Sequence, residues 1–223
     1  MNRILQCLRL DFYTVKPYRQ ALYRLLGLGF ILGFVINRSV SILSSMLMMG
    51  LVIMMSYPFS IGDKYGMDTL YGTLPITRRD VVTGRYLFVI CLELIGAGLV
   101  LLGGWLINQF IATDILFPEL MLTISTLTAV ASIMAAFQFP AFFRLGYARA
   151  KAYSYVPFVL VFVIIGMLPT LIKTFGWSIN ERAIEHFLET NPLLPVVVLV
   201  AVSLLSLGIS WALSVRFYER RDL

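Results

Sequence analysis

The chain has 223 residues, of which 59% are hydrophobic and only 13% are charged, and its formal net charge is +6. Soluble domains carry roughly twice that share of charged residues, so the composition excludes an ordinary soluble globule. Lipid removes the need for a polar surface, and at about 20 residues per helical span the apolar stretches accommodate six spans. The basic residues lie at the ends of these stretches, which favours contact with membrane lipid over nucleic-acid binding.

Residues 1–20 are amphipathic rather than apolar. Hydrophobic residues recur near helical spacing, and charged residues fill much of the remainder, among them Arg3, Arg9, Asp11 and Lys16. This pattern predicts an interfacial helix that lies in the headgroup plane, with its apolar side toward the lipid and its charged side outward. Pro17 is expected to bend the chain into the first span.

Six apolar stretches follow, and each is long enough to cross a bilayer. We expect spans near residues 21–37, 41–61, 86–107, 119–138, 154–172 and 192–215. The predicted fold class is therefore an all-α integral membrane protein, with residues 1–223 forming a single transmembrane domain.

Positive charges are unevenly divided between the two sides of this arrangement. All but three of the 18 lysines and arginines fall in residues 1–24, in the segments 62–85 and 139–153, or in the C-terminal tail. Cytoplasmic segments carry such an excess of basic residues. With an even number of spans, both termini are therefore predicted to be cytoplasmic.

The sequence lacks the common signatures of catalysis. It has one histidine, His186, and therefore no pair of histidines at metal-ligand spacing. It contains neither a G-x-S-x-G nucleophile elbow nor a G-x-x-x-x-G-K-[ST] phosphate loop. We therefore predict no catalytic, cofactor-binding or metal-binding residue in this chain, and any ATP that drives it must be hydrolysed on another polypeptide.

The segment 62–85 is too long for a tight turn and too polar to enter lipid. Its first part is expected to form a short amphipathic helix that Pro75 ends. Thr77 and Asp80 then form a variant of the capping box that begins a new helix. This helix is predicted to continue through Arg85 into the third span. The segment would then be rigid, with a short helix, a bend at Pro75 and a second helix that continues into the membrane.

This segment resembles the coupling region of the permease subunits of type-2 ABC exporters. The resemblance rests on the run YGTLPITRRDVV at residues 71–82 and on Gly84-Arg85-Tyr86. The run LRLDF at residues 8–12, ahead of the first span, agrees with the same family.

The resemblance implies that residues 63–74 are a coupling helix, which docks in a cleft of the ATP-binding subunit. The side chains that it implies as contacts with that subunit are Tyr71, Leu74, Arg78 and Arg79. It also implies that residues 1–16 form an interface helix beside the coupling helix.

The implied function is that of a permease in an ATP-driven exporter of the bacterial cytoplasmic membrane. Two such chains, as a homodimer or a heterodimer, would enclose the path, and two ATP-binding subunits would hold ATP and Mg²⁺. The spans carry no dense set of charges, so the expected substrate is amphipathic or hydrophobic. The resemblance implies a peptide, a toxin or a lipid-like molecule.

Glu93 is the only acidic residue in the interior of a predicted span. An ionisable group in a membrane is costly and so marks a functional candidate. Glu93 is therefore a candidate for lining the translocation path, and pairing with Gln138 is the structural alternative.

The segment 173–191 is predicted to form an extracellular helix on the membrane surface. Ser178 and Glu181 form a capping box at its start, and Asn191 and Pro192 end it.

Two other functions remain open at this point. A six-helix capture component of a vitamin-type importer would also lack ATPase motifs, but it would not need the coupling segment 62–85. An intramembrane enzyme would need a nucleophile or a metal cluster that the sequence does not offer.

Overall fold

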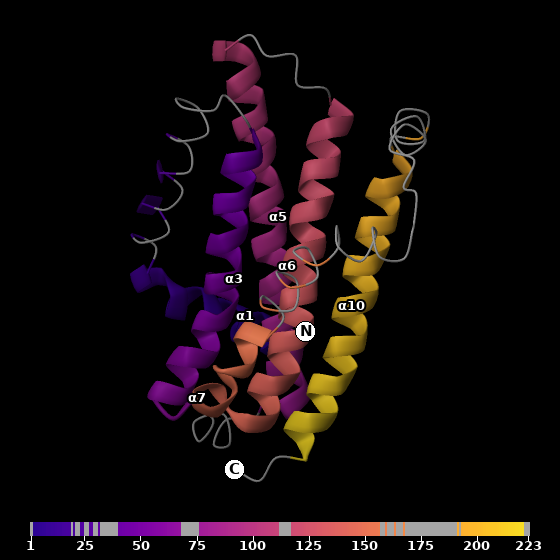
Figure 1. The fold of residues 1–223 in the computed structure, drawn as a ribbon. Coiled ribbons are helices and arrows are strands. Elements are labelled where there is room, and N and C mark those ends of the chain that lie inside the picture. Colours follow the sequence, from indigo (N-terminus) through magenta and orange to yellow (C-terminus); the bar gives the residue numbers. More distant parts are fainter. Residues whose placement is uncertain are drawn as a thin grey trace.

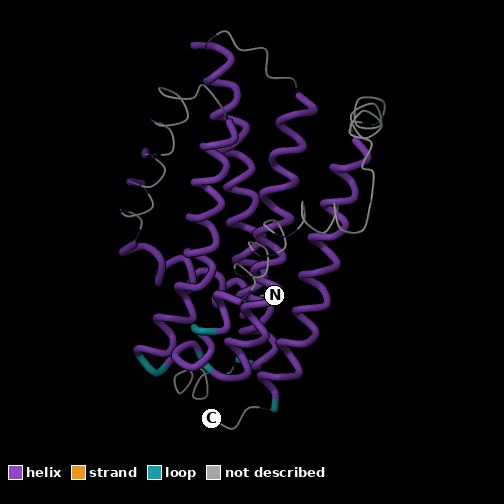
Figure 2. Tube along the Cα trace, in the orientation of Figure 1, coloured by secondary structure: helices purple, strands orange, loops and turns teal. Residues whose placement is uncertain are grey.

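A computed structural model gives the fold of the chain. It describes a few single positions and five continuous stretches, which are residues 2–18, 40–67, 76–111, 117–156 and 193–220. Within these stretches the backbone is helical apart from short turns, and none of it forms a strand (Figure 2). The elements in chain order are α1 (Asn2–Val15), η1 (Lys16–Tyr18), α3 (Val40–Lys64), α5 (Arg78–Ile111), α6 (Phe117–Leu145), α7 (Tyr147–Ala150), η3 (Tyr153–Tyr155) and α10 (Leu193–Glu219).

Four helices, α3, α5, α6 and α10, are long and apolar enough to cross a membrane. They run along a common axis, with α5 opposite in direction to the other three (Figure 1). Four of the predicted spans are thus confirmed as helices. The predicted spans 21–37 and 154–172 lie almost entirely outside the described residues, as does the predicted helix 173–191.

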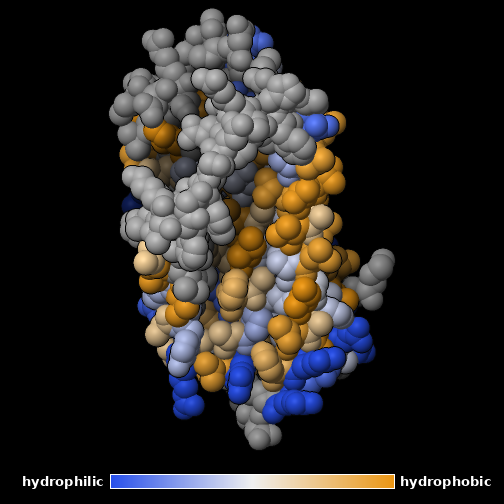
Figure 3. Space-filling model, turned by 45° about the vertical axis from the view of Figure 1, so that its right-hand side comes forward, coloured by the Kyte–Doolittle hydropathy of each residue, from blue (hydrophilic) through white to orange (hydrophobic). Residues whose placement is uncertain are grey.

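One end of the bundle gathers cationic side chains, and we call it the basic end. α3 ends there with Lys64, α5 begins there at Arg78, and α6 and α10 end there with Arg144 and Arg216 in their last turns. Hydrophilic residues cluster at this end, and hydrophobic residues cover the helices above it (Figure 3). The described parts of the segments 62–85 and 139–153 meet here, as expected for segments on one side of a membrane.

α6 is longer than the sequence predicted. It continues to Leu145 with Pro140 in its interior, although residues 139–153 were expected to form a loop. Proline has no N–H to donate to the carbonyl four residues earlier, which here belongs to Ala136. The Ser210 hydroxyl of α10 donates to that carbonyl at 2.9 Å. A neighbouring helix therefore supplies the hydrogen bond that Pro140 cannot make.

Aromatic packing also extends α6 beyond the proline. The Phe59 ring of α3 lies 4.8 Å, 5.0 Å and 5.0 Å, between ring centroids, from Phe139, Phe142 and Phe143. All four residues are buried. Burying rings of this size stabilises the last turns of α6 against α3 more than the proline destabilises them.

α1 crosses the bundle near the basic end instead of running along its axis (Figure 1). The helix predicted for the N-terminal segment is thereby confirmed as Asn2–Val15, and Pro17 falls in η1, directly after it. Cys7, Asp11 and Val15 are its buried residues, at a spacing that places them on one face. α1 is therefore held to the bundle by a single face.

Candidate functional site

The capping box predicted at the start of α5 is confirmed. The Thr77 backbone N–H donates to the Asp80 carboxylate at 3.2 Å, and the Asp80 N–H donates to the Thr77 hydroxyl oxygen at 3.2 Å. The two side chains also bond directly, at 2.7 Å. This reciprocal pair satisfies N–H groups that a helix start leaves without partners. α5 therefore begins at Arg78 and runs without a break through Arg85 into the membrane-spanning part.

Arg78 connects the start of α5 to the end of α10. Its Nη1 donates to the backbone carbonyls of Tyr218 at 2.9 Å and Glu219 at 3.0 Å. The last carbonyls of a helix lack intrahelical donors and carry partial negative charge, so a guanidinium group suits this position. The structure thus gives Arg78 a role inside the chain that sequence reasoning did not foresee.

Arg79 also packs on α10, at a position farther from the C-terminal end of that helix. Its guanidinium carbon lies 5.2 Å from the centroid of the Trp211 ring, and Trp211 Nε1 donates to the Thr83 hydroxyl at 3.2 Å. Arg79 itself remains exposed at the surface. The other two predicted contacts, Tyr71 and Leu74, lie outside the described residues.

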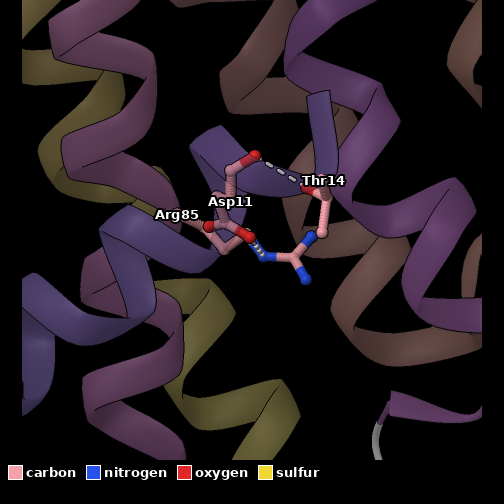
Figure 4. Close-up of polar contacts among 3 residues, drawn as sticks. All are labelled: Asp11, Thr14 and Arg85. Atoms are coloured by element: carbon pink, nitrogen blue, oxygen red, sulfur yellow. Dashed lines mark hydrogen bonds and ion pairs between the residues drawn. The ribbon is translucent and has the colours of Figure 1, made fainter. Parts of the chain in front are cut away.

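A buried ion pair connects α5 to α1. Arg85 Nε lies 3.2 Å from Asp11 Oδ1, and the two side chains are only 6% and 3% exposed (Figure 4). The Arg85 guanidinium carbon also lies 4.4 Å from the centroid of the Phe59 ring of α3. Asp11 was predicted to lie among the outward charges of the amphipathic helix. It faces the protein instead, because Arg85 supplies the positive charge that makes its burial tolerable.

Gly84 lets the two helices approach closely at this point. A Cβ atom added to Gly84 would lie 2.8 Å from Cys7 Cβ, which is closer than carbon atoms pack. Glycine therefore allows the α1 backbone to reach the position from which Asp11 meets Arg85.

Tyr86, the next residue, connects α5 to α10. Its hydroxyl oxygen lies 2.6 Å from Ser210 Oγ and 2.8 Å from Ser214 Oγ, and all three residues are buried. Three consecutive residues of α5 thus contact two different helices. Gly84 and Arg85 contact α1, and Tyr86 contacts α10. Both contacts lie within the first three turns of α5, directly after the segment predicted to couple to an ATPase.

Burial controls the ionisation of the groups at the α1 contact. Desolvation raises the pKa of Asp11 to about 6, and the charge of Arg85 opposes this rise. The pKa of Cys7 is also raised, first by burial and then by the Asp11 carboxylate. Asp11 is therefore ionised and paired at neutral pH, and it takes up a proton in mildly acidic solution.

Glu93 lies deeper in α5 and is 8% exposed. The fully buried Ser132 hydroxyl of α6 donates to Glu93 Oε1 at 2.7 Å. Sequence reasoning had considered Gln138 as the partner, and it missed Ser132 because the alignment of α5 against α6 has no local signal. The contact satisfies an oxygen of Glu93 within the bundle.

A cavity of about 500 Å³ opens between α3, α6 and the short helices that follow α6. Its apolar lining includes Met48, Met49 and Phe142, and its polar lining includes Gln138 and Lys151. Glu93 is not among the described residues that line it. Two flexible methionine side chains of α3 thus form part of its wall and can adapt to ligands of different shape.

Nothing in the described part of the chain gathers three His, Cys, Asp or Glu side chains into a group that could hold a metal ion. The described polar contacts instead join helices: α5 is attached to α1 by an ion pair and to α10 by hydrogen bonds.

Comparison with known proteins agrees with this geometry. The family described as ABC-2 family transporter protein matches residues 7–219, which include the greater part of α1, the predicted coupling segment and all four described spans. No curated protein and no solved structure matches the chain. Since the match extends over almost the whole length, the chain belongs to the ABC-2 family of transporter proteins and is a membrane-spanning permease.

Proposed function

We propose that this chain is the permease subunit of an ATP-driven exporter and moves an amphipathic or hydrophobic substrate across the bacterial cytoplasmic membrane. A separate ABC subunit would bind ATP and Mg²⁺ and hydrolyse the nucleotide. Two permease chains, identical or similar, would enclose the path. The observation that carries this proposal is the double attachment of α5, to α1 through Asp11–Arg85 and to α10 through Arg78 and Tyr86.

This attachment suits a coupling role because of where it lies. The predicted coupling segment leads directly into the capped start of α5. A displacement of that segment would move α5, and both attached helices would move with it. Rigid-body movement of this kind is a recurring way to switch a protein between two states.

The direction of the helices supports six crossings with both termini on one side. α6 ends at the basic end and α10 begins at the opposite end, which is the arrangement that a further span at the predicted position 154–172 requires (Figure 1). α1 contacts the first turns of α5 near the basic end, whereas α3 begins at the opposite end. A further span at the predicted position 21–37 requires this arrangement of α1 and α3, and the excess of basic residues favours a cytoplasmic location for the basic end.

The cavity beside α3 and α6 supports the proposed class of substrate. Its wall is mainly apolar, and Lys151 and Gln138 add polar groups. An amphipathic molecule matches a lining of this kind. The seclusion of Glu93 beside Ser132 favours a structural role for that residue over a place in the path.

The first test is affinity purification of the chain in mild detergent, with mass spectrometry of the proteins that co-elute. We expect an ATP-binding protein with a phosphate-loop motif in equal amount. A solitary, stable chain that binds a small molecule tightly would instead favour a capture component of an importer.

A charge reversal tests the docking contacts on the same sample. Arg79→Glu alters an exposed residue beside the coupling segment, and Arg149→Glu alters an exposed residue of α7 at the same end. We expect Arg79→Glu to reduce the amount of ATP-binding subunit that co-elutes, whereas Arg149→Glu has little effect. Equal recovery with both variants would argue against docking through Arg79.

A further inference from the structure

A second cleft lies beside α1, where exposed side chains of this helix meet α3. Its volume is about 560 Å³, and α1, η1, α3 and a residue farther along the chain contribute to it. The side chains that matter for its chemistry are Arg9, Phe12, Tyr13, Lys16, Tyr23 and Met54. No part of the coupling contacts described above lines this cleft.

The packing of α1 fixes which face it presents to this cleft. Cys7, Asp11 and Val15 are buried against the bundle. Arg9, Tyr13 and Lys16 follow the spacing i, i+4 and i+7, which places them together on the opposite side of the helix. The Asp11–Arg85 pair therefore holds the cationic face outward.

The charge of the cleft is positive. Arg9 and Lys16 are exposed, and none of the described residues that line the cleft is acidic. The nearest acidic group on α1, Asp11, is buried and paired with Arg85. Two cations that lie on the same side of a helix, without a neighbouring carboxylate, attract an anion such as a phosphate group.

The rest of the cleft is apolar and aromatic. Tyr13 and Tyr23 are 68% and 62% exposed, and Lys16 Nζ lies 5.8 Å from the centroid of the Tyr13 ring. Phe12 packs edge-on against Phe88 of α5 with the ring centroids 5.0 Å apart. Exposed tyrosines of this kind favour the boundary between lipid and water, where one end of the side chain is apolar and the other is wet.

The combination identifies an amphipathic anion. A free phosphate would use the two cations and leave the apolar wall without a ligand. A phospholipid can contact both the two cations and the apolar wall, because its phosphate and its acyl chains meet at the depth where an interfacial helix lies. α1 crosses the spans at one level near the basic end, as an interfacial helix must (Figure 1).

We propose that this cleft binds an anionic phospholipid, with Arg9 and Lys16 contacting the phosphate and with Tyr13, Tyr23 and Met54 contacting the upper part of the acyl chains. The bound lipid would attach the outer face of α1 to the membrane, while the inner face is attached to α5.

The experiment measures lipid retained by the full chain. The protein is reconstituted in vesicles of equal phosphatidylglycerol and phosphatidylcholine, extracted in mild detergent, and analysed by native mass spectrometry. The test variant is Arg9→Gln/Lys16→Gln. The matched control, Arg3→Gln/Arg149→Gln, also removes two exposed cations but none from the cleft. A third variant, Arg9→Lys/Lys16→Arg, keeps both charges.

We expect the wild type, the control and the charge-retaining variant to keep phosphatidylglycerol in preference to phosphatidylcholine. We expect the Arg9→Gln/Lys16→Gln variant to retain at least about tenfold less phosphatidylglycerol than the wild type, because each basic residue near an anionic surface contributes measurably to binding. Equal retention by this variant and the wild type would overturn the proposal. Displacement of the lipid by inorganic phosphate would overturn it as well, because the cleft would then be a site for a free anion.

Discussion

Replacing Arg85 with Gln would leave the Asp11 carboxylate buried between α1 and α5 without its guanidinium partner. The pair is almost fully enclosed, so water cannot take over the lost interaction. Removing one member of a buried ion pair typically costs about 3–5 kcal/mol, because an uncompensated charge remains in the interior. We expect this cost to appear as release of α1 from the bundle.

Cys7 provides the assay for that release. Its side chain is buried in the α1–α5 contact, so a maleimide reaches the thiol only when α1 separates from Gly84. The chain has one other cysteine, Cys91, which a Cys91→Ser background removes. A loss of about 3–5 kcal/mol corresponds to faster labelling by roughly two to four orders of magnitude. The labelling rate of Cys7 in each variant is divided by the labelling rate of the same variant in denaturing detergent, which corrects for the intrinsic reactivity of the thiol.

The double variant Asp11→Asn/Arg85→Gln is the control for this reasoning. It removes both charges, so no uncompensated ion stays buried, and we expect its labelling rate to lie much closer to that of the wild type. The reasoning would be refuted if Arg85→Gln labelled within about threefold of the wild type, which corresponds to well below 1 kcal/mol. It would also be refuted if the double variant labelled as fast as the single one.

Three further predictions use similar measurements. Because the pKa of Asp11 is raised from 3.8 to about 6, docked α1 binds the proton more tightly than released α1. Docking therefore strengthens as the pH falls, so normalised labelling at pH 5 should be about tenfold slower than at pH 7, and Asp11→Asn should abolish this difference. Gly84→Ala should speed labelling, since the added Cβ meets Cys7, whereas Gly98→Ala, which meets nothing within 4 Å, should not. Ser210→Ala should lower the free energy of unfolding by about 1–3 kcal/mol in thermal denaturation, because a buried carbonyl loses its donor. Ser206→Ala, whose hydroxyl bonds within its own helix, should change it far less.

The parts of the structure that the sequence predicted are those with local signals. The Thr77–Asp80 box needs residues only three positions apart, and the structure confirms it. The four described spans follow from continuous apolar stretches, whose length and composition suffice to identify them. The amphipathic spacing of the N-terminal segment likewise predicted α1.

The parts that escaped prediction depend on contacts between distant residues. Nothing near Asp11 in the sequence indicates that Arg85 lies against it, so its charge was assigned to the outer face of α1. Residues 139–153 were expected to form a loop, and it is contacts with other helices, such as the Ser210 hydroxyl from α10, that explain why the helix continues past Pro140. In both cases a polar group is satisfied by a partner from another helix, and the pattern of a single helix cannot show this.

The two faces of α1 give this helix a position between the membrane and the moving part of a permease. Its inner face is fixed to α5 by a close glycine contact and by an ion pair whose loss is costly. Its outer face presents two cations and exposed tyrosines, groups that bind at a lipid surface. A movement of α5 would therefore either carry α1 along the membrane surface or separate the two helices. The burial of Cys7, Asp11 and Val15 against the bundle and the close approach at Gly84 favour the first course, in which α1 moves with α5.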